Sequence, residues 1–315
     1  MATQALTSPA IVVARSSWRR YAASFNCRIG LLVLVLVPAE IFLARRLHLN
    51  GLLQFADVWS SVPGIAILLG CLCYGHHYRL VRIIDTCELA IWSRVLMSVF
   101  ALLFQIAGRS PYPFADRQLN TIDARMHVQT ASIVHMVARL PPLVTVLDTA
   151  YTILPVLILC AILVPPFFGD AVASRRFVTG TVLASLIGVV LFGFLPVAGP
   201  WITQPLLPTP KQAAVTAYFV LLKSPGPVRL NYLLGGIVSF PSFHVVYAIL
   251  SAAALGSIRM LRIPVWILAT LICISTITTG WHYGIDVLAG FILSIIVIWL
   301  ARQIEPNGCP AQHSR

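Results

Sequence analysis

The sequence predicts an all-α fold, a polytopic bundle of transmembrane helices. Hydrophobic residues make up 58% of the 315 residues and charged residues only 10%, against roughly 45–50% and about 25% in soluble domains. The apolar residues also gather in runs, and a helix needs about 20 such residues to cross a hydrocarbon core of roughly 30 Å. A surface so poor in charge would not stay dissolved in water, so we expect the apolar excess to face lipid.

Eight apolar runs are candidate spans. They lie at about 29–44, 57–75, 89–108, 141–165, 177–198, 242–258, 263–280 and 283–302. The first run follows four arginines without a convincing small-residue cleavage site, so we expect a retained anchor and not a signal peptide. About eight spans would then pack as one bundle.

Two long connections interrupt this pattern. In 109–140, apolar residues recur from Leu119 onward at roughly helical spacing, so we expect an amphipathic helix at the membrane interface. The 199–241 connection is rich in Pro and Gly, and loops of this length are often functional.

Lysine and arginine are spread unevenly over the two sides of the predicted bundle. Counted over alternate connections, one side holds 12 of them and the other 9. The positive-inside rule therefore predicts cytoplasmic termini, with tails at 1–28 and 304–315. His244 opens the sixth span and His282 lies between the seventh and eighth, so an even number of crossings places both on the same, non-cytoplasmic side.

The formal net charge of +12 raises the question of an acidic partner. The basic residues are scattered between apolar runs without a stripe of interleaved aromatic residues, which argues against nucleic acid. Anionic lipid headgroups in the bilayer are the simpler partner. Seven cysteines lie mostly inside apolar runs, and Cys71 with Cys73 lacks the spacing of a zinc site.

The first chemically distinctive stretch runs from Ser239 to His244 and reads SFPSFH. Proline is favoured in the first turn of a helix, and serine beside it caps the helix or binds an anion. The free N–H groups there, together with the positive end of the helix dipole, form a phosphate site. A histidine in that turn could donate a proton to an oxygen of the phosphate.

The second stretch runs from Thr279 to Asp286. His282 and Asp286 are four residues apart, so on a helix they share one face. A carboxylate bound to one imidazole nitrogen fixes the tautomer and leaves the other nitrogen free as a nucleophile. An acid at the start of a span is also a functional candidate, because charge is costly in a bilayer.

Other interpretations of these residues exist. A histidine at a membrane interface is commonly just tolerated there, and an aspartate at the end of a span can be a solvated cap. Two histidines and an aspartate could also bind zinc. The phosphotransfer interpretation is favoured by the conjunction of both stretches on one membrane face.

The two stretches resemble the second and third signature motifs of the type 2 phosphatidic acid phosphatase (lipid phosphate phosphatase) superfamily, PSGH and SRxxxxxHxxxD. Here they read PSFH at 241–244 and STITTGWHYGID at 275–286. The SFPSFH stretch, the HYxxD ending and the upstream surface helix are similar to the inositolphosphorylceramide synthase-like branch. The resemblance covers roughly residues 115–300 and leaves the first three spans outside it.

The resemblance implies a role for each residue. His282 would attack phosphorus and form a phosphohistidine, with Asp286 orienting it. His244 would protonate the leaving oxygen and then activate the acceptor, while Ser242 and nearby N–H groups hold phosphate oxygens. No metal and no other cofactor is implied.

The chain departs from the family pattern at its phosphate clamp. Thr276 stands where the third motif usually has arginine, and the first motif, KxxxxxxRP, is not present as such. Lys223 and Arg229 have nearly its spacing, six apart instead of seven, so Lys223 is the expected clamp and Arg229 the alternative; either could also be a solvated loop charge.

We therefore predict a lipid phosphotransferase or phosphatase with a six-helix catalytic core, acting on a membrane lipid with a phosphate-containing headgroup. The predicted organisation is an N-terminal tail (1–28), three N-terminal spans (29–108), a catalytic membrane domain (109–303) and a C-terminal tail (304–315). We expect a bacterial inner membrane with the site on the periplasmic side. The alternative is a non-catalytic lipid transporter or flippase on the same scaffold, which broken spans and paired intramembrane charges would indicate. Oligomeric state is not indicated.

Overall fold

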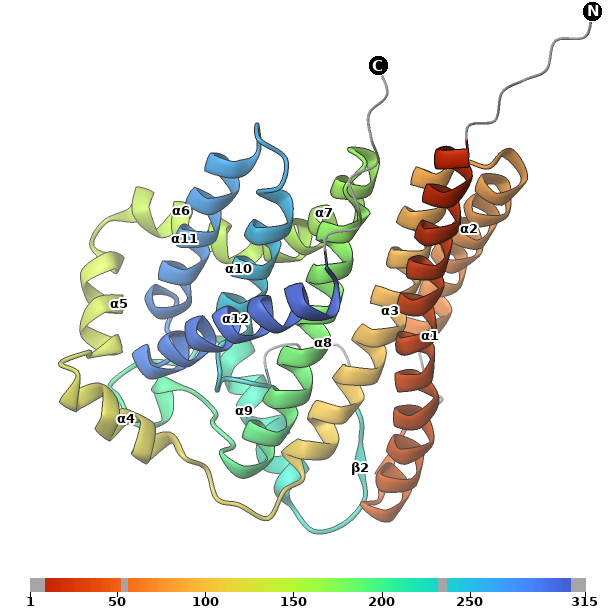
Figure 1. The fold of residues 1–315 in the computed structure, drawn as a ribbon. Coiled ribbons are helices and arrows are strands. Elements are labelled where there is room, and N and C mark those ends of the chain that lie inside the picture. The colour runs from red at the N-terminus through yellow and green to blue at the C-terminus, as the bar shows by residue number, and fades with distance from the viewer. Residues whose placement is uncertain (1–8, 52–55, 232–236, 307–315) are drawn as a thin grey trace, which may run out of the picture.

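The computed structural model describes residues 9–51, 56–231 and 237–306, with side chains described for 25–51, 62–231 and 237–306. Apart from one short strand pairing and one 3₁₀ turn, the regular structure in these residues is α-helical (Figure 1). The helices are α1 (Pro9–Arg46), α2 (Ala56–Tyr78), α3 (Val81–Gly108), α4 (Asp116–Arg125), α5 (Thr130–Ala138), α6 (Pro141–Thr152), α7 (Leu154–Phe167), α8 (Ala171–Phe194), α9 (Pro210–Lys223), α10 (Phe243–Leu255), α11 (Arg262–Thr278) and α12 (Gly284–Ile304). The all-α prediction is confirmed.

The number of spans is smaller than expected. Within the described residues, four helices are long and apolar enough to cross a membrane, namely 25–46 of α1, α3, α8 and α12. A bent pair, α6 with α7, is a fifth candidate. The runs expected to be the sixth and seventh spans form the shorter helices α10 and α11, of 13 and 17 residues. Eight spans are thus not confirmed, although the long apolar helices are those of a multi-pass membrane protein.

The fourth predicted span, 141–165, is divided into two helices. α6 ends at Thr152 and α7 begins at Leu154, and their axes differ by 44°. Pro155 occupies the first turn of α7, and proline has no N–H for the bond that a continuous helix would need there. The bend is therefore located by the proline.

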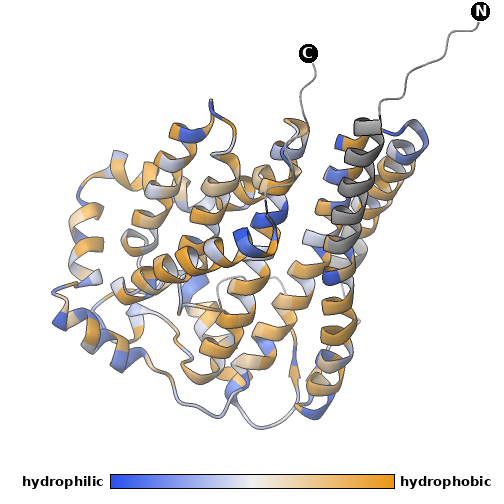
Figure 2. Ribbon diagram, viewed as in Figure 1, coloured by the Kyte–Doolittle hydropathy of each residue, from blue (hydrophilic) through white to orange (hydrophobic). Residues whose placement is uncertain are grey.

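α10 lies at the centre of the predicted catalytic domain. It packs against α7, α8, α11 and α12, and most of its buried hydrophobic side chains belong to the largest hydrophobic cluster. α3 packs along α8 and α7 and joins α1 and α2 to this bundle (Figure 1). Figure 2 shows hydrophobic residues over most of the length of the helices, whereas α4 is largely hydrophilic.

The segment expected to be one interfacial helix forms two. α4 and α5 are separated at residues 126–129, where His127 has a positive φ of 57°. α4 packs on α12, and α5 packs on α11 and α6. Thus α4 covers the start of α12, and α5 covers the end of α11.

The end of α1 is tied to the long 199–241 connection. Strand β1 (Leu49–Asn50) pairs in parallel with β2 (Val228–Arg229). At its other end α1 is helical from Pro9, so most of the segment predicted as an N-terminal tail has helical backbone.

Candidate active site

The site lies where the first turns of α10 and α12 meet. The backbone N–H of Ser242, which precedes α10, donates to the carbonyl oxygen of Asp286 in α12 at 3.0 Å. Gly290 permits this approach, because a Cβ atom there would lie 2.6 Å from the carbonyl oxygen of Ser242. Two stretches more than 35 residues apart in the sequence are thereby brought together.

The two histidines singled out in the sequence face each other across this junction. The ring centroids of His244 and His282 are 5.9 Å apart, with 60° between the ring planes. His282 is 3% exposed, whereas His244 is half-buried. A phosphorus atom between two rings at this separation would be within reach of both.

The surroundings of His282 determine its tautomer. Its Nδ1 atom lies 3.0 Å from the main-chain carbonyl oxygen of Ser239 and 3.5 Å from Oδ2 of Asp286. A carbonyl oxygen can only accept, so Nδ1 carries the proton and donates it to Ser239. Nε2 therefore bears the lone pair that a nucleophile needs.

His282 is a neutral base at physiological pH. Burial, partly offset by the hydrogen bond to Ser239, lowers the pKa of His282 from 6.5 to about 4. We therefore describe His282 and Asp286 as a neutral imidazole beside a carboxyl group and not as an ion pair.

Asp286 is held by its own turn. Its Oδ2 atom accepts from the N–H of Tyr283 at 2.9 Å and from Oγ of Ser239 at 3.2 Å. Its other oxygen, Oδ1, is buried and has no hydrogen-bond partner within the described residues. The sequence had assigned the orientation of His282 to Asp286 alone, whereas in the structure Ser239 supplies the shorter contact, and the sequence prediction did not include it.

Ser242 presents an unused hydroxyl to the site. Its side chain is fully buried, and Oγ has no partner among the described residues. Ser242 is the N-cap residue of α10, yet its side chain does not cap the helix. A buried polar atom without a partner is costly, so this hydroxyl and the free N–H groups of the first turn form a donor set suited to an anion.

Aromatic rings form a wall beside His244. Tyr151, at the end of α6, stacks on the imidazole with centroids 4.1 Å apart and planes 15° apart. Trp281 lies nearly parallel to Tyr151 at 6.4 Å and packs edge-on against Trp201 at 5.4 Å. Stacking fixes the plane of His244, and Trp281 directly precedes His282. The predicted site residues do not include these three rings.

Lys211 is the cation that the structure brings to this wall. It lies in the first turn of α9, with Nζ 5.8 Å from the ring centroid of Trp281, and it is close enough to His244 for an electrostatic interaction. Thr209 precedes α9 as its N-cap residue, and its side chain accepts from Gln212 N–H. The Gln212 side chain donates to the carbonyl of Gly280 at 3.3 Å. Lys211 is one of two lysines in the chain, and this rarity of lysine is the sequence feature that could have drawn attention to it.

The expected phosphate clamp is not found at the histidines: Lys223 and Arg229 lie elsewhere in the structure, and Thr276 has no charge. Lys223 donates to the carbonyl oxygens of Ser110 and Tyr112 at 2.9 and 2.8 Å, which ties the end of α9 to the segment after α3. Arg229 is exposed on β2, without a hydrogen bond or ion pair inside the described ranges. Thr276 is buried and donates to the carbonyl of Cys273. No described contact joins Lys223 or Arg229 to the histidines.

Two acids of α4 hold the start of α12 in place. Asp123 accepts from the N–H groups of Gly284 and Ile285 at 2.7 and 2.8 Å. Asp116 accepts from the N–H groups of Ala198 and Gly199 at 3.0 and 2.8 Å.

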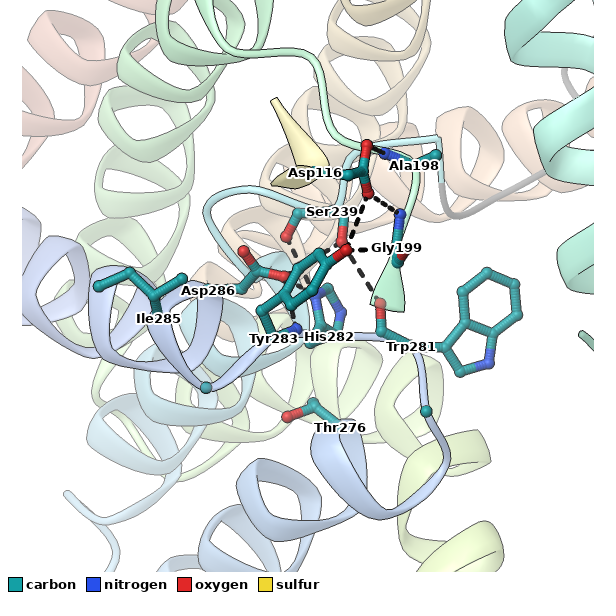
Figure 3. A network of polar contacts seen from close by, with 12 residues as sticks. Asp116, Ala198, Gly199, Ser239, Thr276, Trp281, His282, Tyr283, Ile285 and Asp286 are labelled. Atoms are coloured by element: carbon teal, nitrogen blue, oxygen red, sulfur yellow. Dashed lines mark hydrogen bonds and ion pairs between the residues drawn. The ribbon is translucent and has the colours of Figure 1, made fainter. Parts of the chain in front are cut away.

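Tyr283, the residue that follows His282, is tied to Asp116 by its hydroxyl group. Figure 3 shows its hydroxyl directed at Asp116 and Gly199, at 3.2 and 3.1 Å. Burial raises the pKa of Asp116 and of Asp123, although backbone donors oppose the shift. Asp116, Leu119 and Asp123 are spaced for one helix face, a pattern that would have indicated buried acids.

Metal ligation finds no support in the described part of the chain. No group of three or more His, Cys, Asp or Glu residues there could hold a metal ion.

Comparison with known proteins gives one match. A family model described as the PAP2 superfamily matches residues 117–300, more than half of the chain. This range begins in α4 and ends in α12, and so includes both histidine stretches and Asp123, but not Asp116. No curated protein and no solved structure matches the chain significantly.

Proposed function

The chain belongs to the PAP2 superfamily, and from this premise we propose that it transfers or hydrolyses a phosphate ester of a membrane lipid through a phosphohistidine intermediate. The observation that carries the proposal is the pair of imidazoles at 5.9 Å, with the Nδ1 proton of His282 directed to Ser239. That arrangement leaves Nε2 of a neutral histidine as the nucleophile.

In the first half-reaction, the Nε2 lone pair attacks phosphorus and forms an N–P bond. The P–O bond to the leaving alcohol breaks, and His244, which must first bind a proton from solvent, gives that proton to the leaving oxygen. In the second half-reaction, His244 takes the proton of an acceptor O–H group, the acceptor oxygen bonds to phosphorus, and the N–P bond breaks. Proton transfer by such a group typically contributes about 10²–10⁴-fold.

Ser242 and Lys211 are the groups that we assign to the phosphate. The unpaired hydroxyl of Ser242 and the N–H groups of the first turn of α10 would donate to phosphoryl oxygens. Lys211 would supply the positive charge that Thr276 does not, because it is the cation beside Trp281 and His244. This assignment replaces Lys223, whose ammonium group already has two carbonyl partners.

The acceptor distinguishes a phosphatase from a transferase. A site that passes phosphate to an alcohol must bind a second organic molecule, and the Tyr151–Trp281–Trp201 wall offers flat apolar faces for one. Together with the missing arginine at 276, this favours transferase chemistry of the inositolphosphorylceramide synthase-like kind. Water remains the acceptor of the simpler phosphatase.

The site is assigned to the non-cytoplasmic side, periplasmic if the protein is bacterial. The support comes from the sequence alone: if all eight apolar runs cross the membrane, 12 Lys and Arg residues lie on the side of the termini and 9 on the side of the histidines.

Transport is the competing function, and two features bear on it. α6 and α7 form a bent pair, and Arg175 forms a buried ion pair with Asp85 at 2.8 Å. Both charged residues lie within the first two turns of their helices, α8 and α3, far from the middle of the spans where transported ions bind. We therefore assign this pair a structural role.

The test is an activity panel on the purified full-length protein in detergent. Release of phosphate and exchange of headgroups are measured over a range of phospholipids, for wild type, His282→Ala and His244→Ala. We expect turnover that falls by about 10³-fold or more in His282→Ala. Full activity in both variants would exclude the histidine mechanism, whereas lipid movement across vesicles without turnover would establish transport.

A further inference from the structure

A cavity with charged walls lies at the opposite end of the helices from the histidines. It has a volume of about 330 Å³ and is bounded by the beginnings of α8 and α11 and by the ends of α10 and α12. His244 and Asp286 lie in the first turns of α10 and α12, so the length of these two helices separates the cavity from the candidate active site.

Three arginines from three different helices line this cavity, namely Arg176, Arg262 and Arg302. Two of them are fixed by backbone carbonyls. Nε of Arg176 donates to the carbonyl of Glu305 at 2.8 Å, and Nε of Arg262 donates to the carbonyl of Gly256 at 3.0 Å. These bonds use one edge of each guanidinium group, and the Nη atoms of both groups have no hydrogen-bond acceptor within the described residues. The side chain of Arg302 makes no hydrogen bond or ion pair within those residues.

The negative charge at the cavity does not balance these arginines. Asp170 is the one acid among the lining residues, and its Oδ1 atom already caps α8 by accepting from Ala173 N–H at 3.1 Å. The N-termini of α8 and α11 also lie here, and helix N-termini favour anions. Guanidinium groups bind phosphate oxygens in pairs, which suits a multi-oxygen anion.

Apolar side chains form the remaining walls. Leu250 and Ile298 line the cavity from α10 and α12. Trp266 of α11 also lines it and is 42% exposed on the outside of the bundle. A phosphate-bearing ligand with an adjoining hydrocarbon chain would use both kinds of surface, and tryptophan is the residue that collects at headgroup depth in membrane proteins.

We propose that this cavity binds the phosphate group of an anionic ligand, with the headgroup of an anionic membrane lipid as the source that its apolar walls favour. The site is separate from the histidine pair and does not depend on the proposed reaction. It places one phosphate site at each end of α10 and α12, and the positive-inside rule puts this one on the cytoplasmic side.

Trp266 gives a readout that reports this cavity and not the active site. The full-length protein is reconstituted in phosphatidylcholine vesicles in which about one lipid in five is phosphatidylglycerol with brominated chains, a proportion that gives a strongly anionic surface. Subtracting the quenching of Trp266→Phe from that of wild type isolates the signal of Trp266. We expect stronger quenching than with brominated phosphatidylcholine at the same proportion.

Arg302→Gln is the informative variant, because Arg302 has no internal bond to lose. We expect the apparent affinity for phosphatidylglycerol to fall about tenfold, the cost of one charge-assisted contact. Arg302→Lys should recover part of the affinity. Arg259→Gln is the matched control, because Arg259 is an exposed arginine in the α10–α11 turn that does not line the cavity, and we expect it to resemble wild type.

A second experiment distinguishes a lipid headgroup from free phosphate as the ligand of the cavity. Inorganic phosphate is titrated into protein in pure phosphatidylcholine vesicles, and Trp266 emission is followed. A response that Arg302→Gln abolishes would assign the site to free phosphate, and no response beside strong quenching by phosphatidylglycerol would assign it to lipid. The proposal is overturned if both lipids quench equally without a phosphate response, or if Arg259→Gln and Arg302→Gln lose affinity to the same extent.

Discussion

The Nδ1 atom of His282 lies 3.0 Å from the main-chain carbonyl oxygen of Ser239. This contact joins the loop before α10 to the loop before α12, and it fixes which ring nitrogen faces the space beside His244. Because the acceptor is backbone, the side chain at position 239 can change without removing it. Asp286, at 3.5 Å from the same nitrogen, is in a position to stabilise the positive charge that develops on the ring when Nε2 bonds to phosphorus.

Asp286→Asn is therefore expected to lower kcat by about 10²-fold while KM stays nearly unchanged. The amide can still accept from Tyr283 N–H, so the thermal midpoint should remain close to that of wild type. Ser239→Ala is the matched control, and it should keep kcat within a few-fold because the carbonyl acceptor remains. Equal losses in both variants would show that the hydroxyl network and not the carboxylate charge matters.

The acid side of the pH profile should report the buried state of His282. Burial lowers the pKa of His282 to about 4, so the nucleophile stays neutral well below pH 6.5. We expect kcat/KM to fall with an apparent pKa near 4 and not near 6.5. If kcat/KM instead fell with an apparent pKa of 6.5, His282 would be more exposed to water than its 3% exposure indicates.

The lowered pKa of His282 also makes the stability of the folded protein depend on pH, and the direction of the pKa shift determines whether stability rises or falls with pH. The pKa of His282 is lower in the folded protein than in the unfolded chain, so its contribution is complete above pH 6.5 and is lost as the pH falls toward 4. The slope from this group is about 1.4 kcal/mol per pH unit. Thermal midpoints measured between these values should fall less steeply for His282→Asn than for wild type.

Asp123→Ala should destabilise the protein. The substitution leaves the N–H groups of Gly284 and Ile285 without their carboxylate acceptor in a buried position, which costs about 2–4 kcal/mol for two such groups. The thermal midpoint in detergent is measured as the temperature at which half of the monodisperse elution peak is lost, and it should fall by several degrees. Asp148→Ala is the control, because Asp148 is exposed on α6, and it should change the midpoint little.

The two lysines should separate binding from stability. Lys211→Gln is expected to raise KM about tenfold for a phosphate-bearing substrate, since one charge contact is lost, with an unchanged thermal midpoint. Lys223→Gln should instead lower the midpoint, because its ammonium group holds the carbonyls of Ser110 and Tyr112. The reverse pattern would return the phosphate clamp to Lys223.

The sequence was sufficient for the class of fold, because apolar runs predict helices directly. The expectation that His282 and Asp286 lie on one helix face was wrong: His282 lies in the loop before the N-cap Tyr283 of α12, although its Nδ1 atom is still 3.5 Å from Asp286. The division of the 141–165 run was not predicted, although Pro155 was visible, because proline inside an apolar run often continues a membrane helix when neighbours satisfy the free carbonyl.

The residues that the sequence did not identify all act through long-range contacts. Tyr151 meets His244 only because α6 bends toward α10, and Lys211 reaches Trp281 only because Gln212 anchors α9 to the loop at Gly280. Asp116 and Asp123 lie in a polar connection, where acids are ordinarily solvated, so their sequence context alone does not single them out. Lys223 was favoured by motif spacing, and spacing says nothing about which carbonyls a side chain will meet.

The central claim is that His282 carries the phosphoryl group, and direct trapping of that intermediate tests it. Purified protein is mixed with a phosphorus-labelled lipid substrate, quenched in alkali within the first turnovers, and digested for mass spectrometry. We predict an acid-labile, alkali-stable label on the peptide that contains His282, which is absent in His282→Ala. A label on another residue, or turnover by wild type and by His282→Ala at equal rates, would contradict the account.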